Sequence, residues 1–223
     1  MADRGKSRSH PRTRKSATAA GRAPASAPSS VCVYCGSGLG SDPAYAEAAR
    51  ALGRHLAAQN IGLIYGGGGR GLMGELAQAA IDAGGRVVGI IPEFLIRAEH
   101  AMRSAHLIVT NDMHERKLQM YQRADAFVAL PGGIGTLEEF VEQLTWNQIG
   151  QHNKPLVLVN VLGYWDPLVA LFRHMERNRF IRPGLAIKYA VVGSVDEVVP
   201  AISRGLARAQ TGPQAARIAP EKL

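Results

Sequence analysis

The sequence predicts an α/β protein with a Rossmann-like three-layer fold: a central, mostly parallel sheet flanked by helices on both faces. Two observations support this prediction: the chain contains both short apolar runs of strand length and amphipathic stretches of helical length, and the two kinds of segment alternate along the sequence. Such alternation produces βαβ units, whose crossover helices cover both faces of a parallel sheet. In a sheet of this kind, ligands bind beyond the carboxyl ends of the strands.

Seven segments have the apolar character and the length of strands. They are Val31–Gly36, Ile61–Tyr65, Arg86–Ile91, His106–Val109, Ala126–Leu130, Pro155–Asn160 and Ala190–Val192. The first helix is expected after Asp42, because an N-cap aspartate followed by a proline at the first helical position favours a helix start. Apolar residues at helical spacing then give this helix a buried face: Tyr45, Ala48, Ala49, Leu52 and Leu56.

The formal net charge of +8 belongs to the two ends of the chain. Residues 1–29 carry seven Lys and Arg against one Asp, and the last 23 residues carry four against one Glu, so the 171 residues between them sum to −1. We therefore expect a disordered basic tail over 1–29, one folded domain over 30–205 and a C-terminal tail over 206–223. A nearly neutral domain does not indicate a specific nucleic-acid partner.

The composition of the chain also predicts where in the cell the protein is found. The first residues lack the apolar segment of a secretory signal, and no run of about 18 apolar residues could cross a membrane, so a cytoplasmic protein without membrane contact is expected. The Arg- and Ser-rich start also permits an organelle transit peptide or weak contact with polyanions. Cys32 and Cys35 fall in and beside an apolar strand, which favours packing residues over a redox pair or zinc ligands.

The first of two glycine-rich loops follows the second predicted strand. Gly69, Gly71 and Gly74 satisfy the dinucleotide-binding spacing, with Glu93 19 residues further on. That pattern usually follows the first strand of its domain, so a nicotinamide cofactor is the weakest of three readings. A tight structural turn and a loop that contacts a nucleotide are the other two.

The second loop, Leu130–Glu139, joins the fifth predicted strand to a helix, where backbone amides can hold a phosphate. Thr136 and Glu139 lie three residues apart, which is the spacing of a helix capping box. Glu139 could instead be a catalytic acid, and the residues alone leave both roles open.

Arg116 lies one turn from Met113 and Met120 on a helix that Asp112 is expected to cap. A guanidinium on an apolar face needs an anion, so Arg116 either pairs with a carboxylate inside the protein or faces a ligand. His114, without such a placement, is expected at the surface or as a secondary contact. A Glu139 paired with a cation would have a lowered pKa and stay ionised at neutral pH.

These motifs resemble those of the LOG family, whose members are cytokinin riboside 5′-monophosphate phosphoribohydrolases. The resemblance covers about Val31 to Gly205 and includes a set of ordered segments: Cys35-Gly36-Ser37, Tyr65-Gly66-Gly67-Gly68, Gly71-Leu72-Met73-Gly74, Asp112-Met113-His114-Glu115-Arg116-Lys117, Pro131-Gly132-Gly133-Ile134-Gly135-Thr136-Leu137-Glu138-Glu139 and Thr145-Trp146-Asn147-Gln148-Ile149-Gly150. The sequence departs from the family at Gly69, where many relatives carry a polar residue, and in its long basic start.

The resemblance implies hydrolysis of the N-glycosidic bond of an N6-substituted or plain adenosine 5′-monophosphate by a homodimer. No metal is expected, because no His/Asp/Glu cluster has ligand spacing, and no cofactor is expected either. The resemblance also implies that Arg116 and Glu139 are the catalytic pair. It further implies a set of substrate-binding residues: Gly67, Gly68, Met73, Glu99, Lys117, Gly132, Gly133, Ile134, Gly135, Thr136, Leu137, Glu138 and Thr145. Other readings are a broader purine-nucleotide nucleosidase, a nucleotide carrier without chemistry, and a nicotinamide-dependent oxidoreductase.

Overall fold

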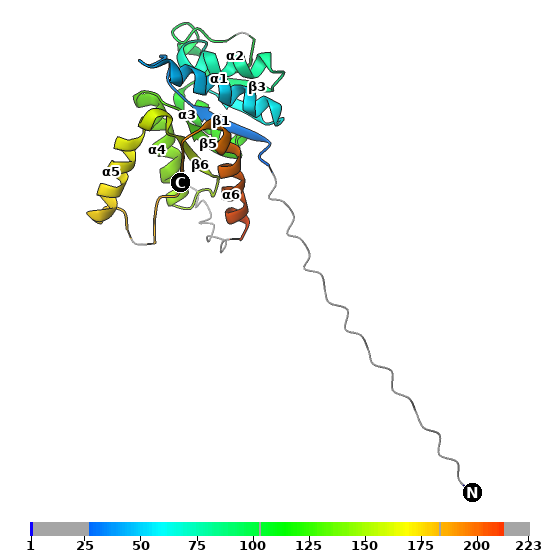
Figure 1. Ribbon diagram of the computed structural model, residues 1–223. Helices are drawn as coiled ribbons and strands as arrows, with labels where there is room; N and C mark the ends of the chain where they lie inside the picture. Colours follow the sequence, from blue (N-terminus) through cyan, green and yellow to red (C-terminus); the bar gives the residue numbers. More distant parts are fainter. Residues whose placement is uncertain (2–26, 103, 183, 212–223) are drawn as a thin grey trace.

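The computed structural model describes Met1 and residues 27–102, 104–182 and 184–211. Within these ranges, seven parallel strands form one sheet in the order β4-β3-β2-β1-β5-β6-β7 (Figure 1). The strands are β1 (Ser30–Tyr34), β2 (Gly62–Tyr65), β3 (Val87–Pro92), β4 (His106–Thr110), β5 (Ala126–Ala129), β6 (Leu156–Val159) and β7 (Ala190–Val192). All seven predicted strands are confirmed, with bounds that differ by at most two residues.

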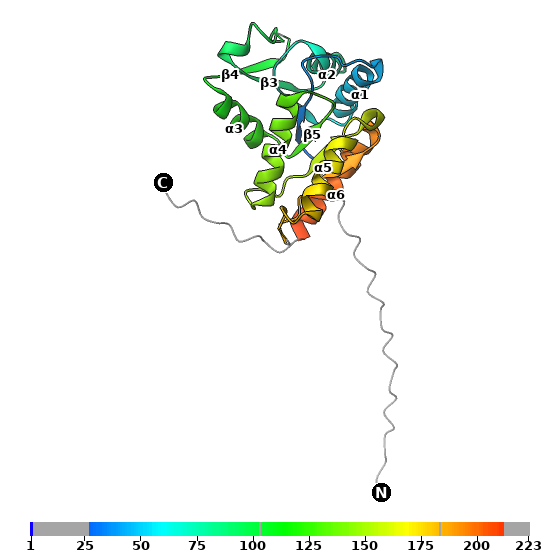
Figure 2. The ribbon, with the colours of Figure 1, turned by 90° about the vertical axis from the view of Figure 1, so that its left-hand side faces the viewer.

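Six helices cover the two faces of this sheet. They are α1 (Pro43–Ala58), α2 (Gly71–Asp82), α3 (Met113–Arg123), α4 (Ile134–Gln148), α5 (Asp166–Arg177) and α6 (Val198–Thr211), with single 3-10 turns η1 (Glu93–Leu95), η2 (Val161–Gly163) and η3 (Val195–Glu197). The buried residues of α1, α2 and α6 pack on one face, and those of α3, α4 and α5 pack on the other. Figure 2 shows α3 on one side of the strands, with α1 and α2 on the other.

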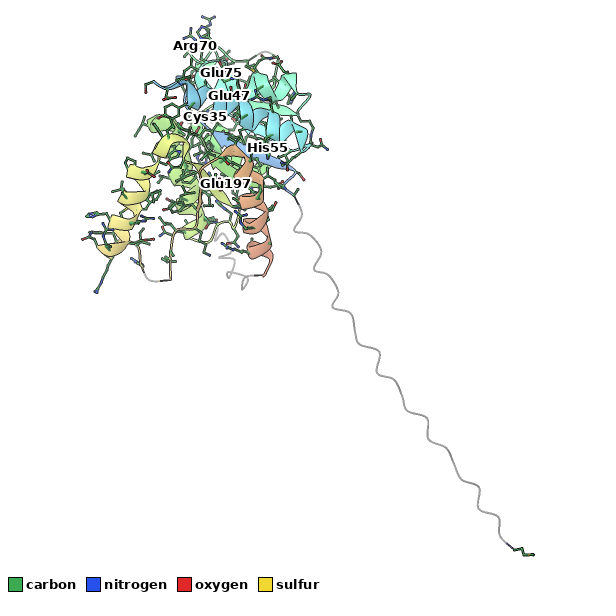
Figure 3. All side chains as sticks on the ribbon, viewed as in Figure 1. Cys35, Glu47, His55, Arg70, Glu75 and Glu197 are labelled. Carbon is green, nitrogen blue, oxygen red and sulfur yellow. The ribbon has the colours of Figure 1, made fainter. Side chains whose placement is uncertain are left out.

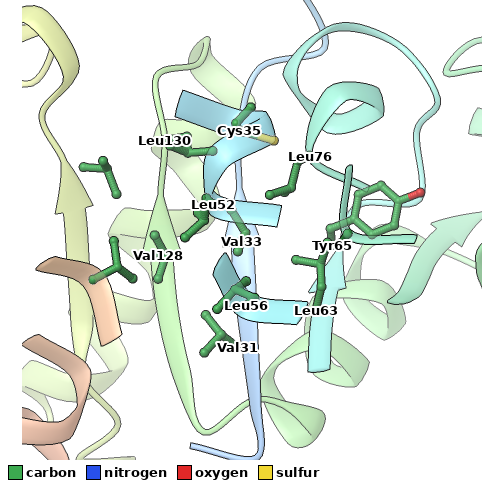
Figure 4. Close-up of a cluster of buried hydrophobic side chains, with 14 of the residues drawn as sticks. Val31, Val33, Cys35, Leu52, Leu56, Leu63, Tyr65, Leu76, Val128 and Leu130 are labelled. Carbon is green, nitrogen blue, oxygen red and sulfur yellow. The ribbon is translucent and has the colours of Figure 1, made fainter. Parts of the chain in front are cut away.

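The two hydrophobic clusters alternate along each strand, as the two-residue period of a strand requires. In β1, Val31 and Val33 face Leu52 and Leu56 of α1 (Figure 4), whereas Cys32 and Tyr34 belong to the opposite cluster. Cys32 and Cys35 are buried and free, and burial raises the pKa of both thiols. Buried, protonated thiols are poor nucleophiles and metal ligands, which supports the packing role expected for both.

Side-chain caps begin two of the helices as predicted. The Asp42 carboxylate accepts a hydrogen bond from the Ala44 amide at 2.8 Å, with Pro43 at the first helical position. The Asp112 carboxylate accepts one from the Glu115 amide, also at 2.8 Å. Helix α6 continues to Thr211, beyond the domain end expected at 205. The expected basic tail lies almost wholly outside the described residues, as does the chain beyond 211.

The sheet order places a switch point between β1 and β5, since the chain builds outward from β1 to β4 and returns beside β1 as β5. The two glycine-rich loops leave the carboxyl ends of β2 and β5, on either side of β1. The loop with dinucleotide spacing therefore starts one strand away from the position that the fingerprint normally occupies. No helix within the described ranges is both long and apolar enough to cross a membrane.

His152 makes the stability of the fold dependent on pH. Its buried ring lies 5.5 Å from the Tyr121 ring and 5.7 Å from the Phe127 ring, and its Nδ1 accepts a hydrogen bond from the Lys154 amide. Burial, with a smaller effect of the Lys154 charge, lowers the pKa of His152 from 6.5 to about 4. Between these values the unfolded chain binds more protons than the native state, so acidification favours unfolding.

We therefore expect the free energy of unfolding to fall by about 2 kcal/mol from this residue between pH 7 and pH 5. Urea denaturation at both values measures it. His152→Gln is the control, because it removes the titrating group and should flatten this part of the pH dependence. Equal pH dependence in the two proteins would contradict the assignment.

Candidate active site

An ion pair between two helices lies at the carboxyl edge of the sheet. Arg116, in the first half of α3, places its Nη1 3.3 Å from Oε1 of Glu139 on α4. Its Nε donates to the Ile90 carbonyl at 3.1 Å, and its Nη2 donates to the Gly66 carbonyl at 3.4 Å. Arg116 and Glu139 keep only 10% and 12% of their side-chain surface exposed. The sequence left two roles open for Arg116, pairing with an internal carboxylate or facing a ligand. The structure shows the pairing.

The capping box proposed for Thr136 and Glu139 is not formed. Helix α4 begins at Ile134, its N-cap is Gly133, and no side chain caps it. The N-cap of α4 is therefore three residues earlier than the cap expected at Thr136, at Gly133 in an extended conformation. Thr136 is buried and packs against Gly132, where an added Cβ would overlap its hydroxyl. Glu139 is thus available to Arg116.

The pKa of Glu139 is raised, contrary to the lowered value expected from its ion pair. Burial is the largest cause and raises it, whereas the Arg116 charge acts in the opposite direction and is smaller. The nearby Glu138 and Glu142 carboxylates raise it further. The sequence suggested the cation but gave no measure of how deeply the carboxylate is buried. A carboxylate with a raised pKa is a stronger base once ionised.

No side chain caps the amides at the start of α4. A Cβ built on Gly133 or on Gly135 would meet no atom within 4 Å other than those of its neighbours along the chain, so the space beside both glycines is open. The Pro131 carbonyl accepts a hydrogen bond from the Gly36 amide at 3.0 Å, which ties this loop to the one after β1. Uncapped amides at a helix start form a site for a phosphate.

The loop after β2 brings further predicted residues to the same edge. Gly67 has a φ of +80°, and its carbonyl accepts from the Met102 amide at 3.0 Å. A Cβ built on Gly68 would lie 3.4 Å from both Oε2 of Glu99 and Sδ of Met73. Gly67, Gly68, Met73 and Glu99 therefore lie together, next to the Gly66 carbonyl that Arg116 contacts.

Two other residues of this loop face away from the ion pair. Arg70 extends outward at the end of the molecule (Figure 3), where its Nη2 lies 2.8 Å from Nε2 of His100. Gly69 is required by packing, since a Cβ there would lie 2.4 Å from the His100 carbonyl oxygen. The tight approach to His100 explains why this chain carries no side chain at position 69.

Lys117 neighbours the pair and is held by two carboxylates of α4. Its Nζ lies 2.7 Å from Glu138 and 2.9 Å from Glu142. Glu142 was not predicted, although it follows Glu138 by four residues on the same helix face. His114 is exposed, as expected.

Thr145 is not brought to the pair. It lies six residues beyond Glu139, about 9 Å along the helix axis, is exposed, and donates to the Val141 carbonyl.

A cavity of about 440 Å³ lies elsewhere, at the amino ends of β6 and β7. Leu156 and Ala190 line it, together with the basic residues Lys154, Lys188, Arg204 and Arg208. It is at the opposite edge of the sheet from Arg116 and Glu139. Because ligands of such sheets bind at the carboxyl edge, the chemistry of that edge identifies the candidate site better than cavity size does. Within the described ranges, no group of three or more His, Cys, Asp or Glu has a metal-binding arrangement.

Solved structures similar to this chain share its fold. The Moco carrier protein of Chlamydomonas reinhardtii matches with a TM-score of 0.59 and 22% identity, over 80% of this chain and 98% of that protein. The molybdenum cofactor binding protein of Rippkaea orientalis matches with a TM-score of 0.58 and 24% identity, over 78% and 95%. At these identities the likeness concerns the fold alone and confirms the Rossmann-like prediction.

Sequence comparison identifies closer relatives. A family model described as "Possible lysine decarboxylase" matches residues 73–202. The cytokinin riboside 5′-monophosphate phosphoribohydrolase of Rhodococcoides fascians is 43% identical over 179 residues, 78% of this chain and 89% of that protein. The probable enzyme LOGL1 of Oryza sativa subsp. japonica, with the same activity in its name, is 47% identical over 153 residues, 68% and 69% of the two chains. The chain therefore belongs to the LOG family of cytokinin riboside 5′-monophosphate phosphoribohydrolases.

Proposed function

We propose that this protein hydrolyses the N-glycosidic bond of adenosine 5′-monophosphates, N6-substituted ones in particular, and releases the free base and ribose 5-phosphate. The observation that carries the proposal is a buried carboxylate, Glu139, on the helix whose open amino end can hold a phosphate. The family relatives carry the same activity in their names. A phosphate anchor and a carboxylate on one helix suit a substrate that has a phosphate and a sugar.

Glu139 supplies the central chemistry of the proposed reaction. Cleavage of a ribosyl C–N bond passes through an oxocarbenium-like state, in which positive charge develops on the sugar. The ionised Glu139 stabilises that charge and takes a proton from the attacking water, whose oxygen bonds to the anomeric carbon as the C–N bond breaks. The bonding electrons leave with the base, which then takes up a proton. Arg116 holds Glu139 in place through its 3.3 Å contact.

The loops on either side supply binding. In the proposed complex the amides from Gly132 to Thr136 hold the 5′-phosphate, which fixes the anomeric carbon relative to Glu139; the Leu137 amide instead donates to the Gly133 carbonyl within α4. The nucleoside is contacted by residues near the Gly66 carbonyl: Gly67 and Gly68 in the loop after β2, Met73 in the first turn of α2, and Glu99 beyond η1. Lys117 and Glu138 contact the nucleotide at the rim of the site.

The remaining proposals concern the oligomeric state and the cellular location of the protein. We infer a homodimer with a site near the subunit interface, in a cytoplasmic protein that needs no metal or cofactor. Thr145, remote from Glu139 in its own subunit, fits a contact made across such an interface better than one within the chain. Sedimentation velocity of the full chain tests the dimer, because a monomer at micromolar concentration would contradict it.

The decisive experiment incubates the protein with AMP and with N6-isopentenyl-AMP and assays free base and ribose 5-phosphate. Release from the substituted nucleotide in preference to AMP is the expected result. Equal release from both would indicate a broader purine-nucleotide nucleosidase. Binding of either nucleotide without release would leave a carrier and refute the hydrolase.

A further inference from the structure

Tyr164 contacts the phosphate loop from a part of the chain that the sequence motifs do not include. It follows η2 in the connection after β6, and its hydroxyl donates to the Gly132 carbonyl at 2.6 Å. Gly132 lies in the turn between β5 and α4, so the bond links two neighbouring connections at the carboxyl edge. The loop is therefore held from both sides, by Gly36 at Pro131 and by Tyr164 at Gly132.

The Gly132 carbonyl and the Gly133 N–H belong to the same peptide group, and Gly133 is the N-cap of α4. A trans peptide is planar, and its C=O and N–H point in opposite directions. Fixing the Gly132 carbonyl towards Tyr164 therefore fixes the Gly133 N–H away from it. A peptide between two glycines rotates easily, because neither residue restricts its backbone angles. Without a partner for the carbonyl, the direction of this amide would not be set.

Tyr164 is itself held in place by several contacts. Its ring lies edge-on to Tyr45, with centroids 5.7 Å apart, and edge-on to Trp165, with centroids 4.9 Å apart. The Asn160 side chain accepts from the Trp165 amide at 2.7 Å and donates to Asp166 at 2.8 Å. These contacts aim the hydroxyl at Gly132 before any ligand binds.

The turn that presents Tyr164 has an unusual backbone. Leu162 has a φ of +52° and a ψ of 28°, and the residue is 66% exposed, so burial of Leu162 does not offset the cost of this conformation. Gly163 follows with a φ of +75°. An unfavourable conformation retained beside a candidate site suggests that the geometry it produces is used.

We propose that Tyr164 is a positioning residue that directs the Gly133 N–H to the 5′-phosphate of the substrate. A hydrogen bond to a carbonyl also polarises its peptide, which makes the attached N–H a better donor. The proposal rests on the proposed function, because it assigns Tyr164 to the phosphate anchor of that same site. It concerns ligands that carry a phosphate and leaves the contacts of the base unaffected.

The test compares binding in a background without turnover. Tyr164→Phe keeps the ring packing and removes only the hydroxyl, and it is combined with Glu139→Gln so that ligands stay intact. By calorimetry we expect AMP and ribose 5-phosphate to bind about fivefold more weakly than to Glu139→Gln alone, the effect of one neutral hydrogen bond. The affinity for adenosine, which has no phosphate, should be unchanged.

Tyr45→Phe in the same background is the matched control, because the Tyr45 hydroxyl has no hydrogen bond to any residue that the structure describes. It should bind all three ligands like the parent. Equal loss for adenosine and AMP would indicate a general structural role and overturn the proposal, as would unchanged affinity for both phosphates. If the Glu139→Gln variant alone binds neither AMP nor ribose 5-phosphate, the proposed nucleotide site is refuted, and the proposed role of Tyr164 is refuted with it.

Discussion

Glu139→Gln should lower kcat by at least about a thousandfold while leaving the affinity for AMP within about threefold of the wild type. The amide has the size of the carboxylate but cannot carry the negative charge that stabilises the developing sugar cation. It cannot accept the proton of the attacking water either. The binding amides of the loop before α4 are untouched by the change. Single-turnover kinetics and calorimetry with the same preparation separate the two effects.

The matched control is Glu75→Gln. Glu75 lies on α2 and pairs with Arg50 of α1 at 2.7 Å (Figure 3 labels Glu75), remote from Glu139. The Glu75→Gln variant removes the same charge from a partly exposed ion pair, and exposed pairs of this kind contribute little to stability. Its kcat should equal that of the wild type. If Glu139→Gln retained near wild-type turnover, the carboxylate assignment would be wrong.

Arg116→Ala should lower kcat/KM by at least about a hundredfold at neutral pH, the scale of a positioned catalytic group. The nearby cation lowers the pKa of Glu139, against the stronger effect of burial. Without Arg116 that pKa rises further, so a larger fraction of Glu139 is protonated and inactive. Part of the lost activity should therefore return as the pH is raised, and the acid limb of the pH–rate profile should move upward.

The pH profile separates two roles of Arg116. An acid limb at the wild-type position, together with a large loss of activity, would show that Arg116 acts on the nucleotide and not through Glu139. Arg116→Lys is the companion variant: its ammonium keeps a charge near Glu139 but cannot make all the contacts of the guanidinium, which reach Glu139 and the Ile90 and Gly66 carbonyls. It should leave the acid limb closer to that of the wild type than Arg116→Ala does. Wild-type kinetics in both variants would return Arg116 to a structural role.

Ionisation of the buried Glu139 carboxylate lowers the stability of the folded protein. The raised pKa of Glu139 means that its ionisation costs folding free energy: the native state is favoured below the ordinary glutamate pKa, and this advantage is lost as the pH rises through the raised value. The form of the carboxylate that the reaction needs is thus the less stable one. Removing Arg116 leaves the carboxylate buried without its partner, and breaking a buried pair in this way costs about 3–5 kcal/mol if the charge persists.

The sequence was sufficient where local rules decide the structure. The strands follow from short apolar runs, and the starts of α1 and α3 follow from Asp42 and Asp112, because a cap depends on a few neighbouring residues. The pairing of Arg116 with a carboxylate was one of two predicted outcomes, because a charge on an apolar helix face demands a counter-charge.

The sequence was insufficient where a property depends on how deeply a side chain is buried, or on contact between loops that are far apart in the chain. The capping box at Thr136 failed because α4 starts earlier than the motif suggests, with Gly133 as its N-cap. The pKa of Glu139 depends on how completely two helices and the sheet bury it, which no motif encodes. Tyr164 lies 32 residues from Gly132, and only the adjacency of β5 and β6 brings them together.

Two of the bonds that hold the Arg116 guanidinium end on main-chain oxygens, those of Ile90 and Gly66. Mutation changes side chains, so no single substitution elsewhere deletes those acceptors. The position of Arg116 beside Glu139 can therefore be kept while many surrounding side chains change, provided that the strands keep their register. Relatives that have diverged in their loops and gained new preferences for the base could keep this arrangement unchanged.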